Sequence, residues 1–401
     1  MLQRTFKAFQ YRDFRLMWLG ACTSTIGTWM HTTAQNWLVL DISQSAFYLG
    51  LDAFLSQIPI FLFTLVGGVV ADRIDRRFIL VGSQLVQMSC AILLGTLFLV
   101  NSVRIEYILM LSFIVGTAQA FGGPAYQALI PSLVKQEDLP NAIALNSIQF
   151  NLGRMVGPAL GLLAMTSLGP AWCFYLNGFS YLAVIATLLT ISSSFKPKAQ
   201  TVSVAESMKQ GFRFIRARDA MGSLIVIAFL MTMLGITMMT FLPVFAKNVF
   251  HRDVSGYTLL LEVAGAGAIA GALAVATFSG AARQGRAAVI NLVLVGMSMV
   301  AFSFSTSLVV SCVILFIGSA ALMSVFALIS SLVQAITPDD MRGRVMSVYN
   351  MAFRGGMPFG SLISGKFVEG YGAPAVVGLN GLLMGVLGLY FLVVRKKVAR
   401  L

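Results

Sequence analysis

Long apolar stretches alternate with short polar connections along the whole chain. A helix that crosses the hydrocarbon core of a bilayer needs about 20 apolar residues, and twelve stretches of this kind can be counted. They cover approximately residues 14–40, 45–71, 78–100, 105–130, 142–167, 171–193, 221–246, 255–279, 287–306, 308–333, 344–367 and 374–394. The pattern therefore predicts an all-α membrane protein with twelve transmembrane helices.

Composition supports lipid as the main solvent of this chain. Of its 401 residues, 58% are hydrophobic and 11% are charged, against about 25% charged in ordinary globular proteins. This excludes a cytosolic enzyme, a disulfide-rich secreted protein and a disordered protein. The four cysteines lie far apart inside apolar stretches without a CxxC spacing, so we expect no metal site and no disulfide framework.

The formal charge of +13 is distributed unevenly between the two sides of the predicted bundle. With a cytoplasmic N-terminus, 22 of the 28 Lys and Arg residues fall on the inner side. They are Arg4, Lys7, Arg12, Arg15, Arg73, Arg76, Arg77, Lys135, Lys196, Lys198, Lys209, Arg213, Arg216, Arg218, Arg283, Arg286, Arg342, Arg344, Arg395, Lys396, Lys397 and Arg400. This positive-inside asymmetry predicts that both termini are cytoplasmic. It favours the bilayer, and not nucleic acid, as the partner of the basic surplus.

Two halves of the sequence repeat each other. At an offset of 210 residues Ser45 aligns with Ser255 and Asp52 with Glu262, and at an offset of 200 residues Pro158 aligns with Pro358. We predict six-helix bundles at 1–194 and 220–401, joined by a basic cytoplasmic linker at 195–219 that contains a candidate amphipathic helix over 204–215. Such duplication is typical of secondary transporters, whose substrate path lies between the repeats.

The loop after the second span carries a recognisable motif. It reads Gly68-Val-Val-Ala-Asp72-Arg73-Ile-Asp75-Arg76-Arg77, which resembles the G-x-x-x-D-R-x-G-R-[RK] signature of the major facilitator superfamily, with Asp75 in place of the usual glycine. Gly68 would let helices approach closely. The resemblance implies that Asp72 and its basic partners Arg73, Arg76 and Arg77 form a cytoplasmic gate between the two halves.

A second motif lies in the fifth span. The segment Gly153-Arg154-Met-Val-Gly157-Pro158-Ala-Leu-Gly161 resembles the G-x-x-x-G-P-x-x-G motif of antiporter-type members of that superfamily. Glycines four residues apart would equally serve simple helix packing. More locally, the chain resembles the enterobactin-exporter-like and macrolide-efflux branch in Trp18–Trp37 of the first span, Phe121-Gly-Gly-Pro124 and Pro338-Asp-Asp-Met-Arg342-Gly-Arg344.

Four charged residues lie well inside the predicted spans: Asp52, Arg154, Glu262 and Arg354. A charge at such a depth costs roughly 2.5–3.5 kcal/mol on insertion scales, so each should face a cavity or a partner. The helix arrangement implied by the resemblance would place Asp52 near Arg354 and Glu262 near Arg154, as two ion pairs between the halves whose acids couple proton entry to substrate exit. The alternative left open is that the acids only lie at the outer headgroup boundary.

His31 lies in the outer half of the first span. It is a candidate for proton coupling, although a lone histidine can equally serve as a hydrogen-bonding group between helices. Other polar residues inside the spans are candidates for lining a substrate cavity. They are Gln35, Asn36, Gln57, Gln119, Asn146, Gln149 and Asn350.

Taken together, these features predict a monomeric, proton-coupled exporter of a small amphipathic molecule, such as a siderophore, a macrolide or another drug, in the bacterial inner membrane. The chain has no G-x-x-x-x-G-K-[ST] phosphate loop and no catalytic constellation, so we expect neither an ATP-driven pump nor an enzyme, and no cofactor. Two alternatives stay open: an uptake transporter for a nutrient or lysolipid, and a membrane sensor that does not transport.

Overall fold

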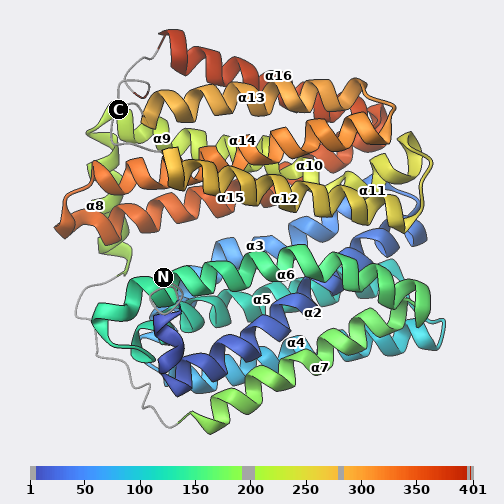
Figure 1. Ribbon diagram of the computed structural model, residues 1–401, viewed down its shortest axis with the longest axis horizontal. Helices are drawn as coiled ribbons and strands as arrows, with labels where there is room; N and C mark the ends of the chain where they lie inside the picture. Colours follow the sequence, from blue (N-terminus) through green and yellow to red (C-terminus); the bar gives the residue numbers. More distant parts are fainter. Residues whose placement is uncertain (1–5, 192–203, 279–283, 395–397, 399–401) are drawn as a thin grey trace. The chain divides into compact units, whose positions relative to one another are not determined.

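A computed structural model describes residues 6–191, 204–278, 284–394 and 398 (Figure 1). Helices account for all the regular secondary structure of these residues. Several residues of the predicted inner-side charge set lie outside the described ranges, namely Arg4, Lys196, Lys198, Arg283, Arg395, Lys396, Lys397 and Arg400.

The described chain contains twelve helical segments long enough to cross a bilayer. They are α2 (Arg12–Ser43), α3 (Ala46–Ala71), α4 (Arg76–Leu99), α5 (Ile105–Leu129), α6 (Leu139–Ser167), α7 (Pro170–Thr190), the run Asp219–Val249, α12 (Val254–Phe278), α13 (Gln284–Phe304), α14 (Leu308–Ala335), α15 (Asp339–Tyr371) and the run Ala373–Val394. Within the described residues, nine of these segments are also apolar enough to span by composition alone. The other three, α2, α6 and α15, carry more polar residues.

Two of the long runs are composite, and short helices connect some of the others. The run Asp219–Val249 consists of α9 (Asp219–Leu230), the π-helical η4 (Met231–Ile236), α10 (Thr237–Thr240), α11 (Leu242–Val244) and the π-helical η5 (Phe245–Val249), and the last run consists of α16 (Ala373–Leu389) and η6 (Tyr390–Val394). The short helices are η1 (Lys7–Gln10), η2 (Ile130–Ser132), η3 (Gln136–Asp138) and α8 (Val204–Arg216). The last of these coincides with the predicted amphipathic stretch of the linker.

The chain forms two compact units. Unit 1 comprises residues 1–43 and 55–201, and unit 2 comprises residues 44–54 and 202–401. The boundary between the two sequence halves therefore lies near the predicted linker, but the first turns of α3 group with unit 2.

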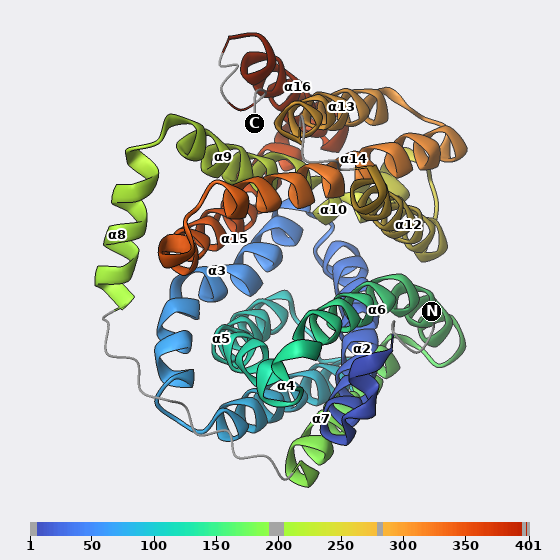
Figure 2. The ribbon, with the colours of Figure 1, turned by 60° about the vertical axis from the view of Figure 1, so that its left-hand side comes forward.

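The same helix pairings recur in both units (Figures 1 and 2). In unit 1, α2 packs on α6 and α4 packs on both α5 and α7; in unit 2, α15 packs on α9 and η4, and α13 packs on both α14 and α16. These pairs are equivalent under the internal repeat. In the sequence alignment of the two halves, α2 corresponds to the run Asp219–Val249 and α6 corresponds to α15. The predicted fold class, an all-α protein of two pseudo-symmetric helical bundles, is confirmed.

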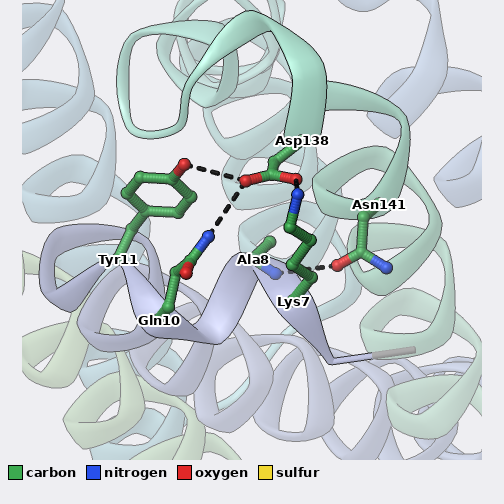
Figure 3. Close-up of polar contacts among 6 residues, drawn as sticks. All are labelled: Lys7, Ala8, Gln10, Tyr11, Asp138 and Asn141. Carbon is green, nitrogen blue, oxygen red and sulfur yellow. Dashed lines mark hydrogen bonds and ion pairs between the residues drawn. The ribbon is translucent and has the colours of Figure 1, made fainter. Parts of the chain in front are cut away.

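A buried carboxylate ties the start of the chain to the start of α6 (Figure 3). The Asp138 side chain is 2% exposed and forms an ion pair of 2.7 Å with the Lys7 ammonium. Its Oδ2 accepts hydrogen bonds from the Tyr11 hydroxyl at 2.8 Å and from Gln10 Nε2 at 3.0 Å. Asn141 Oδ1 accepts from the backbone N–H of Ala8 at 2.8 Å. The side chains of η1 and its flanks thus replace the water that a carboxylate would otherwise bind.

The first turns of α3 run antiparallel to the C-terminal part of α15 inside unit 2. Glu369 Oε2 accepts from the Ser45 hydroxyl at 2.8 Å and from the backbone N–H of Phe47 at 3.3 Å. A carboxylate at a helix N-terminus satisfies amide groups that the helix itself leaves unpaired. Further along, Gly50 lies against α15 so closely that an added Cβ would be 2.9 Å from Gly365 Cα. Two glycines therefore let these helices touch backbone to backbone.

We predict that Gly50→Ala destabilises the protein although alanine is the better helix former. Glycine to alanine in a helix normally stabilises by about 1 kcal/mol, but at position 50 the methyl group has no room, and overpacking costs about 1–3 kcal/mol. Gly82 in α4 is the matched control, because a Cβ there meets nothing within 4 Å. Thermal unfolding in detergent should give a lower midpoint for Gly50→Ala and an equal or higher midpoint for Gly82→Ala. A Gly50→Ala variant as stable as the parent would contradict the close approach.

A second prediction concerns the pH range over which η1 stays attached. The hydrogen bond from Lys7, followed by that from Tyr11, holds the pKa of the Asp138 carboxyl below its usual range. In return, the hydrogen bond to Asp138 raises the pKa of Lys7. The stabilisation is therefore complete above the ordinary aspartate pKa of about 3.9 and is lost as pH falls through the lowered value. At high pH the stabilisation is lost again, as the pH rises through the raised pKa of Lys7.

Asp138→Asn should remove this attachment at neutral pH. Tryptic cleavage after Lys7 in the detergent-solubilised protein should become faster, whereas Glu137→Gln, an exposed neighbour with the same loss of charge, should cleave at the parental rate. Equal rates for all three proteins would refute the anchoring role of Asp138.

Candidate functional site

The charged loop between α3 and α4 is held by helix ends of unit 1. Asp75, which stands where the signature has glycine, is the N-cap of α4 and accepts from the backbone N–H of Arg77 at 2.9 Å. Arg76 donates from Nη1 to the carbonyl of Ala128 at 2.7 Å, and Arg77 donates to the carbonyl of Ile191. Both carbonyls lie at the C-terminal ends of helices, where cations are stabilised. An aspartate therefore replaces a glycine turn with a capped helix start.

The close approach expected at Gly68 occurs at its neighbour. An added Cβ on Gly67 would be 3.1 Å from the Cα of Phe121 in α5, whereas a Cβ on Gly68 would meet nothing within 4 Å among the described residues. Within unit 1 the contact with α5 is therefore made by Gly67, and a helix contact at Gly68 stays a prediction. Asp72 is half-buried and Arg73 is exposed, and their role in a gate stays a prediction.

The glycines of α6 form a seam against α2. Added Cβ atoms on Gly153, Gly157 and Gly161 would all contact α2, at Thr25, Trp29 and Met30 respectively. In unit 2, Gly356 and Gly360 of α15 face Thr232 and Met233 of η4, although they are one residue out of register with the motif of α6 at the 200-residue offset. Pro158 and Pro358 lie inside α6 and α15. The motif is therefore a packing seam of unit 1, and its connection with antiport stays a prediction.

The two arginines inside the spans occupy equivalent places on α6 and α15. Arg154 is half-buried, with its guanidinium carbon 5.8 Å from the centre of the Trp29 ring. Trp29 in turn meets Phe150 edge-on at 6.0 Å. Arg354 is exposed on the surface of unit 2. A guanidinium over an indole face is a favourable cation–π contact, so aromatic side chains partly replace hydration at Arg154.

The two acids differ in burial. Asp52, in the second turn of α3, is 4% exposed, whereas Glu262 on α12 is half-buried. Contacts of α3 with α15 pair Ser45 with Glu369 and Phe54 with Phe359, a register that brings Asp52 level with Ser361. Arg354 lies seven residues away along α15, or about 10 Å.

Neither predicted ion pair is established by this geometry. A direct contact of Asp52 with Arg354 would need the guanidinium to extend along α15, and this pair stays a prediction. The pairing of Glu262 with Arg154 involves residues of different units and likewise stays a prediction.

The candidate cavity residues fall into three groups. Gln149 is 3% exposed and donates from Nε2 to the carbonyl of Ala21 at 2.9 Å, so it joins α6 to α2. Asn146 accepts from the Tyr126 hydroxyl at 2.8 Å. Three others, Asn36, Gln57 and Gln35, are half-buried, whereas Gln119 and Asn350 are exposed.

His31 is brought together with residues that sequence reasoning missed. Its Nε2 is 2.9 Å from Gln35 Oε1, and its Nδ1 is 3.1 Å from Asn177 Nδ2 in α7. Further polar groups, Tyr181, Gln87, Ser83 and Ser112, continue the hydrogen bonding in both directions. A signal existed in the sequence: polar residues recur at i and i+4 inside apolar spans, as in His31/Gln35, Ser83/Gln87 and Asn177/Tyr181.

The part of the chain that the structure describes contains no candidate metal site. No group of three or more His, Cys, Asp or Glu side chains there could hold a metal ion. Three of the four cysteines are buried, Cys312 is half-buried, and all four are free thiols.

Comparison with known sequences covers almost the whole chain. The profile of the transmembrane secretion effector family matches residues 3–400. The enterobactin exporter EntS of Salmonella choleraesuis (strain SC-B67) is 25% identical over 394 residues, which is 96% of this chain and 93% of that protein. The enterobactin exporter EntS of Citrobacter koseri is 26% identical over 392 residues, with 94% and 92% covered.

Solved structures agree on the fold. The nucleoside transporter NupG superposes with a TM-score of 0.75 at 15% identity, covering 96% of this chain and 99% of that one. A bacterial homologue of the human lysosomal transporter Spinster gives a TM-score of 0.71 at 16% identity, with 97% and 95% covered. The protein is a multi-pass membrane transporter and not an enzyme, and it belongs to the transmembrane secretion effector family of the major facilitator superfamily.

Proposed function

We propose that this protein exports a small amphipathic, siderophore-like molecule by alternating access, driven by proton entry. The observation that carries the proposal is the match to enterobactin exporters over more than nine-tenths of both chains, in a fold whose repeated helix pairings occur in both units. Enterobactin is the first substrate to test, because those relatives are named for it.

The proposed orientation has both termini in the cytoplasm of a bacterial inner membrane, with the protein acting as a monomer. Support comes from basic residues at helix ends in each unit: Arg76 and Arg77 begin α4 in unit 1, and Arg213 and Arg216 lie in the last turn of α8 in unit 2. Basic residues in short loops remain on the cytoplasmic side during membrane insertion.

Proton coupling is assigned to Asp52 and Glu262. Each lies in a helix that is apolar enough to span the bilayer, where an ionised carboxylate is costly without a partner or water. A carboxyl that takes up a proton loses this cost, so protonation from the outer side changes the relative populations of the conformations. The two acids hold equivalent positions in the two sequence repeats, which would give each repeat one such switch.

We predict that Glu262→Gln or Asp52→Asn lowers proton-driven enterobactin transport in proteoliposomes about 5- to 150-fold, the range of a typical coupling free energy. An amide cannot bind the proton, so a pH gradient no longer changes the substrate distribution. The matched control is Glu106→Gln, since Glu106 is exposed in the first turn of α5 and should leave transport unchanged.

The direction of transport has its own test in whole cells. For an exporter, an uncoupler should raise the amount of enterobactin retained by cells that make this protein. A fall in retained substrate would instead identify uptake, and parental coupling in both acid variants would remove the proposed mechanism.

A further inference from the structure

A continuous run of polar side chains crosses the interior of unit 1. It links four helices and both ends reach α5. In order, it consists of Ser112 of α5, Gln35 and His31 of α2, Asn177 and Tyr181 of α7, and Gln87 and Ser83 of α4, ending at the carbonyl of Ala118 in α5. Five of these side chains are from 2% to 6% exposed, so water cannot substitute for their partners.

The direction of hydrogen bonding is fixed from the Ser83 end. Gln87 Nε2 donates to the backbone carbonyl of Ser83 at 3.3 Å and to its Oγ at 3.0 Å. A carbonyl can only accept, so the amide nitrogen of Gln87 must face Ser83 and its Oε1 must face the other way. Tyr181 then gives its single hydroxyl proton to Gln87 Oε1 at 3.4 Å, the nearer of two acceptors. The other is Thr28 Oγ1 at 3.5 Å, whose own proton goes to the carbonyl of Ser24.

This direction determines the proton on His31. Because the Tyr181 proton is committed to Gln87, its oxygen accepts from Asn177 Nδ2 at 3.4 Å. The same amide nitrogen lies 3.1 Å from His31 Nδ1, which must therefore accept and carry no proton. The proton of the neutral ring is then on Nε2, which donates to Gln35 Oε1 at 2.9 Å, and Gln35 Nε2 donates to Ser112 Oγ at 2.9 Å.

The rest of the histidine environment is apolar or neutral. The edge of the ring meets Phe174 of α7, with centroids 4.7 Å apart. The neighbours from α7 are Asn177 and Phe174, and Gln35 is the neighbour from α2 itself. Among the described residues, no carboxylate, ammonium or guanidinium contacts His31.

We propose that His31 is a positioning residue and not the proton carrier: Asn177 holds it as a neutral imidazole with its proton on Nε2, and the run joins α2, α4, α5 and α7 into one body. A second proton on Nδ1 would point at the N–H of Asn177. Relieving that clash requires the Asn177 amide to turn over. Its Oδ1 would then face the Tyr181 hydroxyl, whose single proton cannot serve both Asn177 Oδ1 and Gln87 Oε1, so one of these two bonds is lost. Protonation is therefore opposed by the whole run.

The tautomer can be read directly, because the chain contains only two histidines. The other, His251, is exposed and has a positive φ of 50°, a conformation that asparagine tolerates, so His251→Asn leaves a single imidazole. ¹⁵N spectra of this protein in lipid bilayers should show Nε2 protonated and Nδ1 unprotonated from about pH 5 to 8, the range in which an ordinary histidine titrates. A ring that titrates in this range, or one protonated on Nδ1, would overturn the proposal.

A second variant tests the part played by Asn177. In the same background, Asn177→Asp replaces the donor opposite Nδ1 with an acceptor of nearly equal shape. Both ring nitrogens should then be protonated at neutral pH, since a facing carboxylate favours the imidazolium. An unchanged spectrum would show that Asn177 does not set the tautomer.

Transport separates positioning from proton carriage. This measurement rests on the proposed function, whereas the spectra do not. If the protein transported nothing, the spectra would still show whether the His31 ring is neutral with its proton on Nε2. His31→Gln keeps a donor near the Nε2 position and loses the Asn177 contact. It should lower the melting temperature and the transport rate, while the pH at half-maximal transport stays at the parental value. A shift in that pH would assign proton carriage to His31 and overturn the proposal.

Discussion

The structure is governed by the absence of water inside the bilayer. Every polar group within a span must find its partner in the protein, and the helices solve this locally wherever they can. Along α2, the hydroxyls of Thr25, Thr28, Thr32 and Thr33 each donate to the carbonyl four residues earlier. Polar side chains that are too long to bond to their own helix in this way must form hydrogen bonds with another helix. These contacts decide which helices stay together.

The same constraint explains why the fold was readable from the sequence. Apolar runs of bilayer length identified the spanning helices, and the repeat identified the two bundles. The three helices with more polar sequences, α2, α6 and α15, were found as well, because their polar residues are interrupted by apolar and glycine positions. A glycine spacing predicts that a helix has a flat face, but it does not name the neighbour. Hence Gly67, and not Gly68, turned out to approach α5.

The candidate site was harder to predict, for a physical reason. Hydrogen bonds between helices depend on rotation and depth, which a single sequence does not encode. His31 and Gln35 are one turn apart on one helix, so their contact follows from helix geometry; Asn177 lies 146 residues further on, and nothing in its own span pointed to His31. Likewise Asp75 was recognisable as a departure from the signature, but its function as a helix cap required coordinates.

The division of α3 between the units has a mechanical consequence. Residues 46–54 of this helix group with unit 2 and the remainder groups with unit 1, and Pro59, which removes a backbone hydrogen bond, lies just beyond the division. Any displacement of one unit against the other must therefore be taken up along this helix. Bending at Pro59 would cost the least energy, because the helix lacks one backbone hydrogen bond there. The helix α3 would then work as a hinge that resists bending, unlike a flexible linker peptide.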